Sequence, residues 1–137
     1  MALFPNKLNH DYKGSKIAIY GLYPIFALYI FRSLVHFLSE NAGLVGIATI
    51  KELPIIDNID PNNLVYLFAS LWGATQVSLT LVLLILFIKY KSLIPLIYMI
   101  CLSDHCFRLI SGLLHPLTDE YYILSLIHIS EPTRLLA

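Results

Sequence analysis

Three long apolar stretches, separated by short polar segments, dominate the hydrophobic pattern of this chain. Residues 64–88 contain no charged side chain, residues 17–38 contain one arginine, and residues 93–114 contain one aspartate and one arginine. A transmembrane α-helix needs about 20 mainly apolar residues. The pattern therefore predicts an all-α membrane helix bundle with transmembrane helices over about 17–38, 64–88 and 93–114. A cleaved signal peptide is the alternative for residues 17–38, but no A-x-A cleavage site follows them.

The composition supports this fold class. The chain of 137 residues is 58% hydrophobic and 13% charged, with a mean hydropathy of +0.74, whereas soluble domains are about 45–50% apolar and 25% charged. Nine basic and nine acidic residues cancel, and no basic cluster resembles a phosphate-binding footprint, so we expect no nucleic-acid partner. Because no nucleophile elbow, P-loop, GxGxxG or HExxH motif occurs, we predict that the protein is not an enzyme.

The last residues, 124–137, read "LSLIHISEPTRLLA" and resemble a translated sequencing adapter. We expect a non-native read-through tail here and a single transmembrane helical unit over residues 1–123. This tail begins where a further hydrophobic segment starts after "DEYYI", which predicts that a fourth helix is truncated. A genuine amphipathic tail is the alternative interpretation.

Lysines in the loops predict the orientation, because cytoplasmic loops are enriched in lysine and arginine. The segment before residue 17 and the connection between the second and third stretches are basic. Residues 39–63 carry four acidic residues and one lysine. We therefore predict a multi-pass protein of the plasma or inner membrane with a cytoplasmic N-terminus. The lysines that carry this prediction are Lys7, Lys13, Lys16, Lys89 and Lys91.

The charges within residues 93–114 predict a buried site. Eleven leucine, isoleucine and phenylalanine residues contribute about −0.3 to −0.6 kcal/mol each to insertion, while Asp104 and Arg108 cost about 2.5 to 3.5 kcal/mol each. Because this sum is near zero, we expect the third helix to face the other helices, with Asp104 and Arg108 paired at i,i+4.

Helical periodicity groups polar and small residues on one face of each predicted helix. On the third helix this face comprises Cys101, Asp104, Arg108, Gly112 and His115. A matching face on the second comprises Ala69, Gly73, Gln76 and Thr80, and the first offers Tyr29, Arg32 and His36. Small residues permit close helix approach and Gln76 can hydrogen-bond across helices, so these faces predict an outward-facing polar pocket.

We expect the central pocket residues to be Asp104, Arg108, Arg32 and Gln76, with a secondary set of His36, His105, His115 and Tyr29. Two arginines against one aspartate leave a positive charge, which suits an anionic or quinone-like ligand, a carboxylate from the predicted fourth helix or a headgroup phosphate. The alternatives are a purely structural Asp104–Arg108 pair and an Arg32 side chain that extends to the interface.

Metal and haem chemistry find little support. Cys101, Asp104, His105 and Cys106 are close in sequence, but neighbouring helical residues point about 100° apart and do not close one tetrahedral site. A haem bound by His36 and His115 is an alternative without a second histidine pair to support it. We therefore predict no metal and no cofactor.

The order of a Trp- and Gln-bearing span, a basic hairpin and a span with an acid followed by an arginine resembles bacterial four-helix membrane proteins of unknown function, over residues 16–117. The resemblance implies a four-helix bundle and no catalytic residues. We thus expect a structural or partner- or ligand-binding bundle whose partners are the lipid bilayer and a second copy or another subunit. A small-ligand or proton-linked carrier and a haem- or quinone-binding redox subunit are the alternatives.

Overall fold

The computed structural model describes residues 4–123, and the predicted tail and fourth helix lie outside them. Three α-helices and two short 3₁₀ helices form this part of the chain, which contains no β-strand beyond isolated bridges. The three α-helices are long and apolar enough to cross a membrane, and they match the three predicted spans. In chain order the elements are α1 (Lys16–Leu38), α2 (Asn62–Lys89), η1 (Lys91–Leu93), α3 (Ile94–Leu114) and η2 (Asp119–Tyr121).

Polar side chains mark where the helices begin. The Ser15 hydroxyl accepts a hydrogen bond from the Ile17 N–H, at 3.2 Å, and so caps α1. The Asp60 carboxylate accepts one from the Asn62 N–H, at 2.9 Å, at the start of α2. Pro95 lies in the first turn of α3, where its missing N–H costs nothing. Local sequence therefore sets these boundaries before any helix packs against another.

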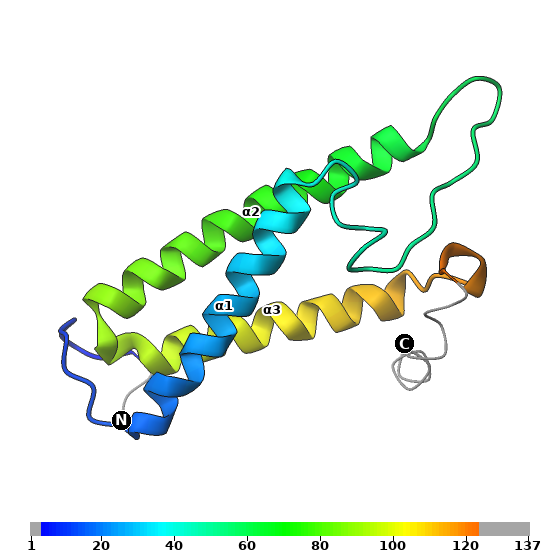
Figure 1. Cartoon of the computed structure of the whole chain (residues 1–137). Coiled ribbons are helices and arrows are strands. Elements are labelled where there is room, and N and C mark those ends of the chain that lie inside the picture. Colours follow the sequence, from blue (N-terminus) through cyan, green and yellow to red (C-terminus); the bar gives the residue numbers. More distant parts are fainter. Residues whose placement is uncertain (1–3, 124–137) are drawn as a thin grey trace.

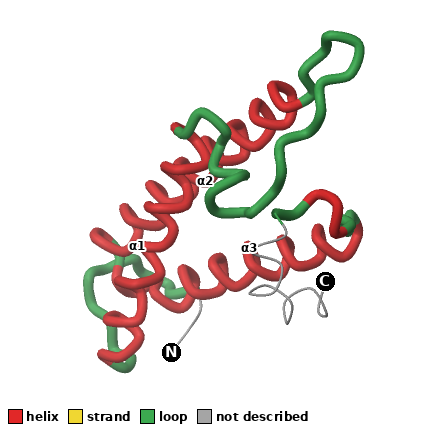
Figure 2. Tube along the Cα trace, turned by 45° about the vertical axis from the view of Figure 1, so that its right-hand side comes forward, coloured by secondary structure: helices red, strands yellow, loops and turns green. Residues whose placement is uncertain are grey.

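Helices α2 and α3 lie together at their connection and separate toward their other ends, whereas the end of α1 stays in contact with α2 (Figures 1 and 2). Helices α2 and α3 leave their η1 connection as a hairpin and diverge, and α1 crosses this hairpin. The core lies near the hairpin end, where burial of apolar side chains from all three helices stabilises the fold. Its fully buried side chains are Leu22 of α1, Leu83 of α2, and Ile94 and Ile97 of α3.

The small-residue face of α2 packs against α1. A Cβ atom added to Gly73 would lie 2.6 Å from the backbone carbonyl carbon of His36 and 2.6 Å from the backbone nitrogen of Phe37. Beside it, the Ser70 hydroxyl donates to the Phe37 carbonyl oxygen at 3.1 Å. The sequence pairs this face with the third helix. In the structure the close helix–helix approach is instead between α1 and α2, because α3 diverges from α2.

The same divergence exposes the second half of α3. A Cβ atom on Gly112 would meet nothing within 4 Å, and His115 ends the helix at an exposed position. The prediction that the polar face of the third helix points inward is therefore wrong for Gly112 and His115, which follow Arg108. Periodicity assigns a face to each residue, but the angle between helices decides how far along that face contacts extend.

The loop after α1 returns to the end of α3. The Lys51 N–H donates to the Tyr121 carbonyl oxygen at 2.8 Å, and the Ile123 N–H donates to the Thr49 carbonyl oxygen at 2.9 Å. This apolar loop consists of turns and this short pairing. The pairing spans the open end between α1 and α3.

The α1–α2 crossing generates a stability prediction. Gly73→Ala places a methyl group against the backbone of α1, and overpacking of this kind costs about 1–3 kcal/mol. Gly112→Ala, on the exposed face of α3, is the matched control and should leave stability unchanged or slightly raised. Thermal unfolding of the purified protein in detergent, followed by circular dichroism, compares the two. Equal melting temperatures for both variants would contradict close packing at Gly73.

Candidate functional site

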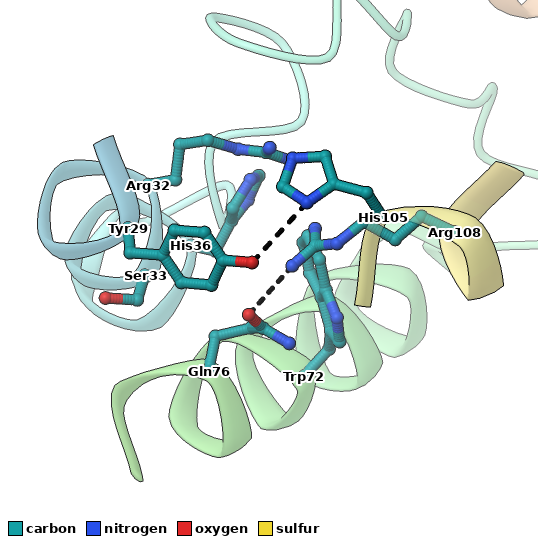
Figure 3. A pocket seen from close by; sticks show the side chains of 8 residues that line it. All are labelled: Tyr29, Arg32, Ser33, His36, Trp72, Gln76, His105 and Arg108. Carbon is teal, nitrogen blue, oxygen red and sulfur yellow. Dashed lines mark hydrogen bonds between the residues drawn. The ribbon is translucent and has the colours of Figure 1, made fainter. Parts of the chain in front are cut away.

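A polar pocket is lined by side chains from α1, α2 and α3 (Figure 3). Its volume is about 10 Å³, which is roughly the space that one water molecule occupies by this measure. The pocket is therefore suited to one small group. The residues that line it are Tyr29, Arg32, Ser33, His36, Trp72, Gln76, His105 and Arg108.

The Asp104 carboxylate does not line the pocket but bonds to residues that do, and it joins α1 to α3. Its Oδ2 atom accepts from the Tyr29 hydroxyl at 3.0 Å and from Arg108 Nε at 2.9 Å. Arg108 Nη2 also lies 2.9 Å from this oxygen, so the pair spaced i,i+4 forms a two-nitrogen ion pair. Charge-assisted bonds of this kind are shorter and stronger than neutral ones.

Gln76 of α2 completes the network. Its Nε2 atom donates to Asp104 Oδ1 at 3.4 Å, and its Oε1 atom accepts from Arg108 Nη2 at 2.7 Å. The amide therefore meets an acceptor with its N–H and a donor with its oxygen, as Figure 3 shows for the bond to Arg108. The network of Tyr29, Gln76, Asp104 and Arg108 links all three helices.

Trp72 supports the guanidinium from the α2 side. The Arg108 guanidinium carbon lies 4.8 Å from the Trp72 ring centroid, within cation–π range. The His36 ring packs on the same indole, with centroids 4.7 Å apart. Trp72 and Ser33 both line the pocket, although neither belongs to the central or secondary set of pocket residues predicted from the sequence. One signal was available: Trp72 precedes Gln76 by one helical turn.

The two pocket histidines are held by backbone carbonyl groups. His36 is buried, and its Nδ1 atom donates to the Ala42 carbonyl oxygen at 2.6 Å. His105 Nδ1 lies 2.9 Å from the Cys101 carbonyl oxygen and 3.5 Å from the Tyr29 hydroxyl. Since Nδ1 of His36 faces a carbonyl acceptor, it carries the proton, and its Nε2 is the ring nitrogen left for a further partner.

Arg32 differs from every other charged group of the pocket. Its side chain extends from α1 across the pocket (Figure 3), but no hydrogen bond or ion pair joins it to another residue within 4–123. It lies within electrostatic reach of Arg108 and Asp104. Because Asp104 is already paired with Arg108, the positive charge of Arg32 is not compensated by the residues around it.

The structure thus brings most of the predicted site residues to one place. Arg32, Arg108, Gln76, Tyr29, His36 and His105 line the pocket, and Asp104 bonds to three of them. His115 lies outside the lining, at the exposed end of α3. Among the residues described, no three His, Cys, Asp or Glu side chains are placed to hold a metal ion.

Comparison with protein-family models, with curated proteins and with solved structures finds no match to this chain. The resemblance to four-helix membrane proteins stays a prediction. The function must be argued from the geometry of the pocket.

The Asp104–Arg108 pair generates a prediction about stability. Asp104→Leu leaves Arg108 without its carboxylate, and Arg108→Leu leaves Asp104 without its cation; each should cost about 1–3 kcal/mol. The double variant removes both charges and should be less destabilised than the sum of the single variants. Thermal unfolding in detergent measures all three.

Ser103→Leu is the control for this set, because the Ser103 hydroxyl bonds only to the Met99 carbonyl oxygen of its own helix, at 2.8 Å. It should change stability little. Strictly additive losses for the two charged residues would show that they do not stabilise each other.

Proposed function

We propose that this protein is a membrane-embedded binding module whose three-helix pocket takes up one small anionic group from a ligand or partner. The group is a carboxylate, a phosphate oxygen or an ion of similar size. The single observation that carries the proposal is the Arg32 guanidinium, which reaches the pocket without a hydrogen-bonded partner while Arg108 is already neutralised by Asp104. Charged groups in membranes face a partner or a water-filled cavity.

The surroundings of Arg32 favour an anion. Donor groups outnumber free acceptors, since both Asp104 oxygens accept hydrogen bonds from the network and the Gln76 oxygen accepts from Arg108. The network holds these groups in place before a ligand arrives, which reduces the entropy lost on binding. An anion next to Arg32 would balance the charge of the pocket without disturbing the Asp104–Arg108 pair.

Pocket size separates this function from its alternatives. A volume of about 10 Å³ admits one water-sized group, whereas cofactor and drug-sized ligands occupy clefts of several hundred Å³. This supports uptake of a small group over a haem- or quinone-binding redox subunit and over a carrier of larger ligands. No comparison identifies a catalytic family, and we propose a binding function without catalysis.

We also propose the orientation of the module in the plasma or inner membrane. The lysine-bearing start of α1 and the α2–α3 connection lie at the same end of the bundle (Figure 1). The acidic residues of the loop after α1 and of η2 lie toward the other end. By the positive-inside rule the N-terminus is cytoplasmic, and the pocket then faces the outer half of the bilayer.

The experiment that tests the proposal measures anion-dependent stability. A ligand that binds only the folded state stabilises it by an amount that grows with its concentration relative to Kd. The melting temperature of the purified protein should rise as acetate or chloride is added. Arg32→Gln should abolish this rise.

Lys51→Gln is the matched control, since Lys51 is an exposed cation of the loop and lies outside the pocket. It should retain the full response to acetate or chloride. The same response in the Arg32→Gln protein would overturn the proposal. A haem absorption band or bound quinone in the purified protein would instead favour the redox alternative.

A further inference from the structure

The end of the bundle opposite the acidic loop carries a basic surface assembled from two separate parts of the chain. We define this surface as the five lysines of the N-terminal segment, of the first turn of α1 and of the α2–α3 connection. Within residues 4–123, no ion pair compensates any of them, and Asp11 is the one acidic residue in these segments. The lysines are Lys7, Lys13, Lys16, Lys89 and Lys91.

The N-terminal segment is fixed to the hairpin. The Asn9 N–H donates to the Ser92 hydroxyl at 3.2 Å, and the Ser92 N–H donates to the Asn9 carbonyl oxygen at 3.3 Å. The Asn9 side chain accepts from the Asp11 N–H at 3.1 Å, and Tyr12 packs against the apolar core. Figure 1 shows this segment beside the α2–α3 connection. These bonds hold the N-terminal segment against the start of the α2–α3 connection.

A cavity of about 370 Å³ is lined by residues of the N-terminal segment and, from the hairpin, by Ser92. Lys7 and Lys13 supply positive charge to its lining, Asn9, Tyr12 and Ser92 supply polar groups, and Asp11 supplies one opposing charge. The cavity lies where α1 begins and α2 ends, at the level where lipid headgroups meet the ends of membrane-spanning helices. Its volume is far larger than one water-sized space, so a phosphate-bearing headgroup fits its size and charge.

We propose that this cavity binds the phosphate of an anionic membrane lipid, with Lys7 and Lys13 as its cationic contacts. The sequence shows no basic cluster that resembles a phosphate-binding footprint, but in the folded chain Lys7 and Lys13 line one cavity together with Ser92 of the hairpin. Juxtamembrane lysines attract anionic lipids, and this attraction falls within a Debye length. The site is separate from the Arg32 pocket and does not depend on the function proposed for it.

A lipid titration of the purified full chain in a neutral detergent tests the site. Short-chain phosphatidylglycerol should raise the melting temperature in a saturable way, while short-chain phosphatidylcholine and inorganic phosphate should not match it. The variant Lys7→Gln/Lys13→Gln should weaken the apparent affinity for phosphatidylglycerol by about tenfold. Lys51→Gln, which removes a lysine at the opposite end, should leave the affinity unchanged.

Asp11→Asn should change the affinity for phosphatidylglycerol in the opposite direction. Removing the one carboxylate of the cavity lining should strengthen binding of phosphatidylglycerol, so the site can be tested even where the double lysine variant unfolds. Unchanged affinity in Asp11→Asn or in the folded double lysine variant would overturn the proposal. An equal shift with phosphatidylcholine, or with inorganic phosphate alone, would overturn the assignment to an anionic lipid.

Discussion

The Asp104 carboxylate is the group on which the arrangement of the three helices depends. It lies in a helix whose apolar residues barely offset the cost of inserting one aspartate and one arginine, so its charge must be neutralised by protein groups. Tyr29, Arg108 and Gln76 supply those groups from α1, α3 and α2. A single partly buried acid therefore joins all three helices at one level.

That requirement accounts for the shape of the bundle. Apolar packing around Leu22, Leu83 and Ile97 brings the helices together near the hairpin, and the Asp104 network lies farther along α3. Beyond Arg108 no polar bond ties α3 to its neighbours within the described residues, and there the helix separates from α2. The pocket lies at this transition, where polar side chains are still fixed in position and one of them, Arg32, has no hydrogen-bonded partner.

Much of this architecture could be predicted from sequence, because hydropathy changes sharply at the ends of each apolar stretch. For the second span, the predicted residues 64–88 agree with the observed helix α2, Asn62–Lys89, to within two residues at each end. Depth could be inferred too: Gln76 and Asp104 lie equally far from Tyr90 along an antiparallel hairpin, as do Trp72 and Arg108. The angle between α2 and α3 could not be inferred from the sequence, because periodicity carries no information on helix crossing. For this reason the packing partner of Gly73 and the exposure of His115 required the structure.

The most direct test of the central role of Asp104 is a double-mutant cycle between Tyr29→Phe and Asp104→Asn, read by thermal unfolding in detergent. The two side chains share a hydrogen bond between α1 and α3, so the account predicts a coupling free energy of about 0.5–3 kcal/mol. Additive losses, with no coupling between the two substitutions, would contradict the claim that this carboxylate joins the helices.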